Sequence, residues 1–401
     1  MANVFNFCAK ISLPKETEKF KPVEKKSFAS GWENMTIKFN AISGTNRVLC
    51  LVQGGRWNNE AKNTVKTFSK STTDANGKVT KGVSIEIPWA KRFDKEQIEK
   101  VAGFKKFICD TGDYKERYKL QDLVKAFENG SVTDEQMATL DIRTLEDAKA
   151  ALEKSQAKRR EFISEWDFAE FVAKLVASDK YKNNLFNISG NYEVAYNAEK
   201  DRFYTNYHVN RITLAAEDAE PTTEMKVDFF YGTDAWDDSN VEETGKVIVN
   251  GWFSYYDSNL KKNGFQNIAV VIREANEKKR NALKRKFAVE EGIKQIGLTL
   301  SVIDGAEVIE LTMDMLDDET REDIECGLLD FEDVKRELGG RAIGDRISEL
   351  RFAELTPKKN VAQDTVYTVE DMHPAKVEVI EEDEEEEDSN FDIFDDDDDE
   401  L

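Results

Sequence analysis

Aromatic and basic residues alternate at several places along this 401-residue chain. In the stretch TVKTFSK, Lys66, Phe68 and Lys70 are spaced two residues apart, which places them on one face of a β-strand. Such a face can bind a single nucleic-acid strand, because aromatic rings stack on bases while Lys and Arg contact phosphates. The alternative is that the aromatic residues belong to the core and the lysines to a solvated outer face.

The same combination recurs further along the chain. Arg56 and Trp57 follow a run of apolar residues, and the two-residue period puts Tyr204 and His208 on one strand face. The candidate DNA-binding residues are Arg47, Arg56, Trp57, Lys62, Lys66, Phe68, Lys70, Trp89, Arg92, Tyr204, His208, Trp252, Tyr255 and Lys261.

Short β-strands are expected to carry the first group of these residues. Apolar and polar residues alternate from Met35, and an apolar run follows at 48–52. Gly54-Gly55 predicts a bulge or sharp bend, and Asn76-Gly77 predicts a hairpin. Residues 1–93 are therefore predicted to form a basic OB-like β unit.

Helical periodicity replaces this pattern in residues 94–182, which are predicted to form a helical insert. Thr133 with Gln136 fits a capping box, and Thr144 with Asp147 marks the start of another helix. A long helical stretch is expected from there to about Val176, with an apolar stripe that packs against the rest of the protein.

Strand patterns return in residues 183–357, where five strand-like runs precede Glu277. A hairpin is expected around Asp304-Gly305, helices in 317–338, and a last strand in 346–355. The predicted fold class is α+β: two OB-like Greek-key β-barrel units, with the helical insert between them. Residues 358–401 are predicted to be a linker and a disordered acidic tail.

Charge is unevenly distributed over the chain. The formal net charge is −23, yet residues 1–110 contain 20 Lys and Arg against 11 Asp and Glu. A basic N-terminal region indicates contact with nucleic acid. It argues against a protein that binds only basic partners.

The C-terminal tail has an unusual composition. Residues 381–401 contain fifteen acidic residues, no basic residue and four apolar residues. The apolar residues, Phe391, Ile393, Phe394 and Leu401, favour a short docking peptide for a partner protein over a plain solubility tail.

No catalytic motif can be assembled from this sequence. It lacks a P-loop, an HExxH motif and a CxxC pair, and it contains two histidines and four widely spaced cysteines. We therefore expect no enzyme activity, no metal site and no cofactor. Neither a signal peptide nor an 18-residue apolar run is evident, so a cytoplasmic protein is expected, in the host cell if a phage encodes it.

The basic, bent β units and the tail SNFDIFDDDDDEL together resemble phage-type single-stranded DNA-binding proteins. That resemblance implies OB-fold cores and a role in DNA replication, recombination or repair. It also implies that the tail recruits a polymerase, helicase or recombinase and competes for the DNA groove. In bacterial members the tail tip ends in an aromatic residue after the acids, whereas here the aromatic residues precede them.

Two other functions remain open from the sequence. An acidic-tailed adaptor or chaperone would bind proteins and not DNA. An RNA-binding protein would use the same stacking surface, because stacking does not detect the 2′-hydroxyl. Self-association is a further expectation, while the size of the binding site is not encoded in any visible pattern.

Overall fold

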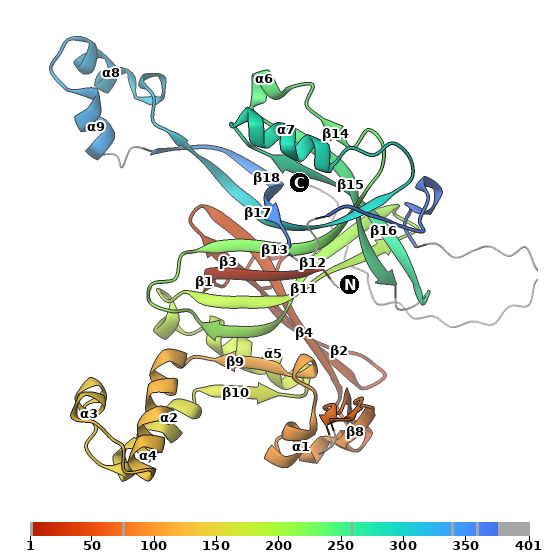
Figure 1. Cartoon of the computed structure of the whole chain (residues 1–401), viewed down its shortest axis with the longest axis vertical. Helices are drawn as coiled ribbons and strands as arrows, with labels where there is room; N and C mark the ends of the chain where they lie inside the picture. The colour runs from red at the N-terminus through yellow and green to blue at the C-terminus, as the bar shows by residue number, and fades with distance from the viewer. Residues whose placement is uncertain (1–2, 74–76, 258–259, 338–340, 358–360, 376–401) are drawn as a thin grey trace, which may run out of the picture.

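The computed structural model describes residues 3–73, 77–257, 260–337, 341–357 and 361–375. Within them the protein is mostly β-sheet with some helices, and 15 strands join into one continuous sheet (Figure 1). The predicted tail residues Phe391, Ile393, Phe394 and Leu401 lie outside the described residues.

Five strands close into a first ring: β1 (Val4–Ser12), β3 (Trp32–Ser43), β4 (Asn46–Trp57), β11 (Phe186–Asn197) and β12 (Arg202–Leu214). β1 pairs with β3 and β11, β3 pairs with β4, and β11 pairs with β12. A parallel pairing between β12 and β4 closes the ring.

A second ring repeats this order with β13 (Thr222–Tyr231), β15 (Val247–Asp257), β16 (Lys262–Ile272), β17 (Lys294–Glu310) and β18 (Arg341–Leu355). Its parallel pair is β16 with β18, and β17 closes the ring by pairing with β13. An antiparallel pairing of β1 with β13 joins the two rings into one sheet.

The pairings divide the chain differently from the sequence prediction. β11 and β12 fall in the predicted second unit, yet their partners β1 and β4 place them in the first ring. The change between rings therefore comes between β12 and β13.

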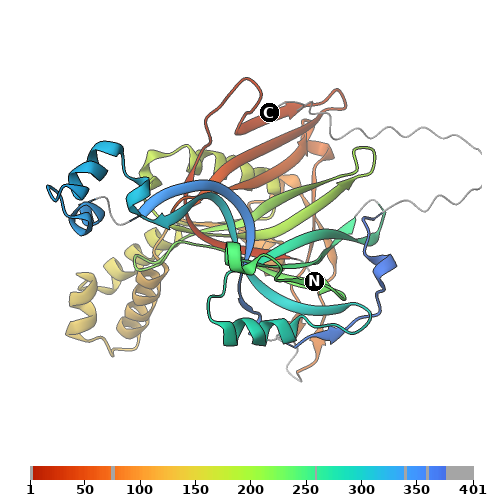
Figure 2. The same cartoon turned by 90° about the horizontal axis from the view of Figure 1, so that it is seen from above.

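The last α-helix before the fourth strand of each ring packs against that ring. α5 (Glu165–Val176) lies below the first ring, where Phe168 and Val172 are fully buried against the strands. α7 (Glu277–Lys286) packs beside the second ring through Leu283 and the adjoining Phe287 (Figure 2). A single core runs through both rings, because their inward residues belong to one contiguous cluster.

Gly54 and Gly55 do not form the predicted bulge. The register between β3 and β4 is continuous through both residues. A Cβ on Gly54 would lie 2.4 Å from the backbone of Glu165 and Trp166, and a Cβ on Gly55 would lie 2.1 Å from the ring of Trp32. These glycines are needed because a helix and an indole approach the strand closely.

A small hairpin module follows β4, the third strand of the first ring. It consists of β5 (Thr64–Phe68) paired with β8 (Ser84–Pro88), β6 (Thr72–Thr73) paired with β7 (Val79–Thr80), and α1 (Lys95–Lys100). This pairing confirms the predicted hairpin. The module packs on Trp166 at the start of α5.

The predicted helical insert also contains strands. β9 (Phe107–Asp110) pairs with β10 (Arg159–Phe162), and β9 joins the first ring beside β12. The prediction of one long helix from Thr144 is wrong, because β10 separates α4 (Leu145–Gln156) from α5. The capping box of Thr133 and Gln136 is confirmed at the start of α3 (Asp134–Leu140), and α2 is Tyr114–Glu128.

The predicted hairpin at Asp304-Gly305 is wrong. β17 runs straight through these residues, and Gly305 lies opposite Ile347 of β18 and Asn46 of β4. The extended β17 and β18 form an arm that ends in two helices, α8 (Asp318–Glu325) and α9 (Phe331–Glu337).

The remaining elements are short. They are β2 (Val23–Ser27) on the edge of β3, β14 (Trp236–Asp237), α6 (Val241–Thr244), β19 (Gln363–Asp364), and the 3-10 turns Glu60–Lys62, Trp89–Lys91, Gly103–Lys105, Asp179–Tyr181, Met313–Met315 and Val369–Asp371.

Candidate nucleic-acid interface

The outer face of β3 and β4 carries polar and basic side chains. Strand alternation buries Ile37 and Phe39 in the ring and turns Lys38 and Arg47 outward. Lys38 stands opposite Leu51 on the neighbouring strand. The face therefore offers cations with apolar surface between them, as a strand-tracking site requires.

Trp57 lies at the end of this face. Its ring packs edge-on against Trp32, with ring centroids 5.2 Å apart. The Lys62 ammonium lies 5.4 Å from the Trp57 ring centroid. Asn63 fixes the backbone of Trp57 through two hydrogen bonds of 2.8 and 2.7 Å. Trp32, which sequence reasoning missed, thus forms one aromatic group with a predicted residue.

Phe68 is the most open of the predicted aromatic residues on the hairpin module. Its side chain is 42% exposed, and the Lys105 ammonium lies 5.7 Å from its ring centroid. Lys66 and Lys70 are also exposed, and Lys66 forms only a loose ion pair of 3.7 Å with Glu86. In these four residues a solvent-exposed phenylalanine ring is accompanied by three lysines.

Two further phenylalanines in this part of the chain were not among the candidate residues. Phe93 and Phe104 are exposed, at 59% and 77%. Each is next to a basic residue in the sequence: Arg92 precedes Phe93, and Lys105 follows Phe104. The motif of an aromatic residue beside a cation could have identified both.

Arg56 has a structural partner. Its Nε donates to Glu33 at 2.9 Å, and its guanidinium stacks 4.3 Å from the centroid of the Trp166 ring. The hydrogen bond from Arg56 keeps the pKa of Glu33 below its ordinary value. Arg56 therefore joins β4 to α5, and its predicted role as a phosphate ligand stays a prediction.

Burial corrects the predicted stacking role of Trp89, and Arg92 beside it makes structural contacts. Trp89 is 6% exposed, so a base cannot stack on it. Arg92 stacks on that indole at 4.1 Å and donates to both carboxylate oxygens of Asp167, at 2.8 and 3.3 Å. The pair holds the hairpin module against α5.

β12 presents a second aromatic and basic group. Tyr204 is exposed, with the Arg202 guanidinium 5.6 Å from its ring centroid. His208 lies on the same face and pairs with Glu193 at 2.8 Å. Burial lowers the pKa of His208, but the hydrogen bond and charge of Glu193 outweigh it, so the pKa lies above its ordinary value.

The predicted residues of the second ring do not extend this surface. Tyr255 is 8% exposed, and its hydroxyl accepts a hydrogen bond from the Ala375 amide at 3.0 Å. Trp252 is half-buried and packs against the apolar cluster of Phe230 and Phe265. Burial therefore corrects the stacking role of Tyr255, while Lys261 stays exposed in the turn before β16.

The structure thus brings together two sets of predicted residues: Trp57 with Lys62 at the end of β4, and Lys66, Phe68 and Lys70 on the module that follows. Arg47 lies ten residues along the extended β4 from Trp57, about 33 Å away.

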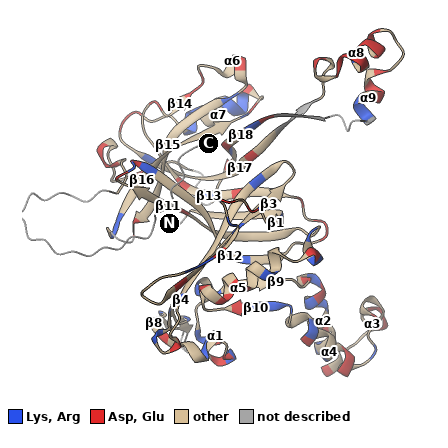
Figure 3. Ribbon diagram, turned by 180° about the vertical axis from the view of Figure 1, so that it is seen from behind, with Lys and Arg blue, Asp and Glu red and all other residues tan. Residues whose placement is uncertain are grey.

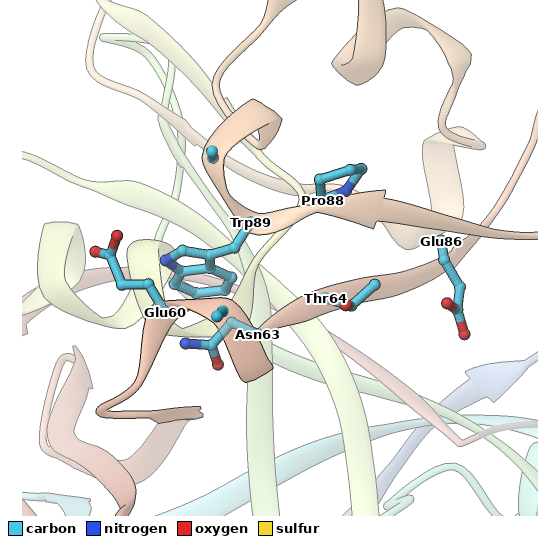
Figure 4. Close-up of a pocket in the computed structure, with 8 residues that line it drawn as sticks. Glu60, Asn63, Thr64, Glu86, Pro88 and Trp89 are labelled. Atoms are coloured by element: carbon cyan, nitrogen blue, oxygen red, sulfur yellow. The ribbon is translucent and has the colours of Figure 1, made fainter.

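A shallow pocket of about 530 Å³ is lined by side chains from residues 60–64 and 86–90 (Figure 4). Trp89 and Pro88 give it an apolar wall, while the carboxylates of Glu60 and Glu86 line its rim. Two acidic side chains make it unsuitable for a phosphate group.

Among the described residues no cluster of His, Cys, Asp and Glu could hold a metal ion. Cys8, Cys50 and Cys109 are buried, and burial raises the pKa of the Cys109 thiol to about 12. No helix in the described part of the chain is long and apolar enough to cross a membrane.

Neither a family model nor a curated protein matches this chain. Among solved structures it is similar to the wild-type single-stranded DNA binding protein of Thermus aquaticus, at 8% identity and a TM-score of 0.30, covering 91% of this chain and 97% of that one. A deletion mutant of the same protein matches at 7% identity and a TM-score of 0.26, covering 75% and 87%.

Proposed function

We propose that the protein binds and coats single-stranded DNA. The main support is the solvent-exposed Phe68 ring, which is accompanied by Lys66, Lys70 and Lys105. Trp57 with Lys62 supplies a second stacking position on the preceding strand. Rings with adjacent cations suit a flexible strand whose bases and phosphates are both exposed, and they require no particular sequence.

The strand order supports this function. Each ring follows the order one, two, three, five, four, with the third and fifth strands parallel and a helix before the fourth. We propose that both rings are OB-type barrels. In such barrels the face of strands two and three binds oligonucleotides. In the first ring these strands are β3 and β4, which carry Lys38 and Trp57.

A direct titration tests the proposal. Fluorescently labelled oligo-dT should bind more tightly than duplex DNA of the same length, which hides its bases. Equal binding of an RNA oligomer would favour the RNA-binding alternative. If no nucleic acid binds at low salt, the protein-binding adaptor becomes the better account.

We expect binding to weaken steeply as salt is added. Each lysine–phosphate contact releases counterions from the strand, so log K should fall by about 0.7 per contact for each unit of log salt. Titrations of oligo-dT at several NaCl concentrations give this slope directly. Tight binding with a flat salt response would contradict the role of Lys62, Lys66 and Lys70.

In the proposed setting, phage-type replication, recombination or repair, the tail has two separable roles. Its acids compete for the basic surface, and Phe391, Ile393 and Phe394 dock a polymerase, helicase or recombinase. Attachment to the same chain gives the tail a local concentration of about millimolar at this surface, enough for weak competition. No catalytic step is part of this proposal.

Deleting residues 381–401 should raise the affinity for oligo-dT, most clearly at low salt, because salt screens the competing charges. Changing Phe391, Ile393 and Phe394 to Ser retains every charge. That variant should bind DNA like the parent and yet recover fewer partner proteins from a cell lysate. Equal recovery by the Ser variant and the parent would show that the apolar residues have no docking role.

A further inference from the structure

The arm formed by β17 and β18 carries a surface that the proposed function does not use. We name residues 313–336 the head; it contains α8 and α9 and projects from the body in two perpendicular views (Figures 1 and 2). The head has ten Asp and Glu against three Lys and Arg. In Figure 3 the ribbon of α8 is largely coloured as acidic residues, whereas the ribbon of α7 on the body is largely coloured as basic residues.

Two exposed leucines, Leu328 and Leu329, interrupt the acidic surface of the head, and we name them the knuckle leucines. α8 ends at a left-handed glycine, Gly327, with φ +75°. The amides of Leu328 and Leu329 then both donate to the Asp323 carbonyl, at 2.8 and 3.2 Å. This turn holds Leu328 74% exposed and Leu329 exposed beside it. Two fixed leucines surrounded by acids are typical of a contact with a protein that is both apolar and basic.

A surface that is both apolar and basic lies on the hairpin module, at the opposite end of the molecule from the head. We name residues 77–83 the hairpin tip; it contains two lysines and no acidic residue. Val79 and Val83 are each more than half exposed there. Two hydrogen bonds fix the end of the tip: the Ser69 amide donates to the Val83 carbonyl at 2.9 Å, and the Val83 amide donates to the Ser69 hydroxyl at 3.0 Å. Basic α7 is an alternative docking surface for the head. Its charge is complementary, but it has no exposed large apolar residue on which the leucines could pack.

We propose that the head of one molecule docks on the hairpin tip of a second copy of this chain. The knuckle leucines pack on Val79 and Val83, and Lys78 and Lys81 face the acids of α8. The head and the hairpin module lie at opposite ends of the molecule, so one chain cannot satisfy the contact itself (Figure 1). A contact between two different surfaces leaves one of each free and extends into an open array.

The expectation that the contact forms an array along a DNA strand rests on the proposed function. The contact between two copies of the chain does not depend on it. Two leucines against two valines form a small interface, so it should be weak in free solution. Molecules bound side by side on one strand have a high effective concentration for each other. Head docking would then make binding to a long strand cooperative.

Cross-linking tests the contact on the full chain. Cys326 is exposed on the head, and the other three cysteines are buried. A Thr80→Cys variant adds a second accessible thiol on the hairpin tip. With a short bismaleimide and long poly-dT at low salt, it should give a ladder of multimers on a denaturing gel. The parent, and a Lys115→Cys variant with its thiol on α2, should give none.

A loss-of-contact pair completes the design. Leu328→Ser/Leu329→Ser in the Thr80→Cys background should abolish the ladder, as should Val79→Ser/Val83→Ser. Affinity for an oligo-dT that holds one molecule should not change, while affinity for a long strand should fall about tenfold. All these residues are exposed, so the variants should fold.

Mixing the two loss-of-contact chains should restore cross-linked dimers but no longer species, because each chain keeps one intact surface. A ladder from Lys115→Cys equal to that from Thr80→Cys, or no ladder on bound DNA, overturns the proposal. Failure of every variant to bind oligo-dT would instead reject the proposed function.

Discussion

Replacing Trp57 and Phe68 by alanine should weaken binding to oligo-dT by roughly 1–3 kcal/mol for each residue, as base stacking on aromatic side chains predicts. Phe68 is open to solvent beside Lys105, and Trp57 is partly exposed beside Lys62. Each substitution removes a ring and leaves its neighbouring cation. The salt dependence should therefore change little while the affinity falls.

Fluorescence anisotropy at one salt concentration measures this effect, and thermal melting measures the fold. Tyr114→Ala is the matched control, because Tyr114 is an exposed aromatic residue on α2, outside the two predicted sets. It should bind like the parent. A variant of Trp57 or Phe68 that unfolds would show that the ring supports the core, and one that binds like Tyr114→Ala would remove it from the interface.

The local elements of this fold were predictable from the sequence because short-range patterns encode them. Alternation from Phe186 to Ile272 identified β11, β12, β13, β15 and β16. Errors arose where a contact distant in the sequence overrides a local pattern. Asp304-Gly305 is a good turn dipeptide, but in this chain Gly305 is required by the turn between β3 and β4: a Cβ there would lie 2.2 Å from the Thr45 carbonyl oxygen.

The ring pairings were not predictable, because their partners are far apart in the sequence. β1 pairs with β11 across about 180 residues, and nothing in either strand identifies the other. The same separation explains the errors at the site. Arg92 and Trp89 look like an open aromatic and basic pair, but Asp167, 75 residues after Arg92, binds the guanidinium and completes a buried junction.

A buried ion pair in the insert should have the largest effect on stability. Arg117 of α2 donates from both Nη atoms to the two carboxylate oxygens of Asp110, at 2.7 and 2.8 Å. The side chains are 10% and 5% exposed. The Gly112 amide and the Ser155 carbonyl complete the network at 3.0 and 3.2 Å. The pair thereby connects β9 with α2 and α4.

Asp110→Ala should lower the free energy of unfolding by about 3–5 kcal/mol, because it leaves a buried guanidinium charge without its partner. Urea unfolding gives the total loss. Hydrogen exchange locates it, and we expect the loss of protection in α2 and α4 to exceed that in the rings. Asp218→Ala is the matched control: it removes an exposed pair with Lys115 of 3.1 Å and should change stability little.

The effect should depend on pH in a defined direction. Burial raises the pKa of Asp110, but the hydrogen bonds from Arg117 and Gly112 outweigh it, so the folded-state pKa lies below the ordinary value. The stabilisation is complete above the unfolded pKa of about 3.9 and is lost as pH falls through the lower folded value. The parent and Asp110→Asn should therefore differ most at neutral pH and converge in acid. A difference that stays constant from pH 7 to strongly acidic conditions would show that the ionised carboxylate is not what stabilises the insert.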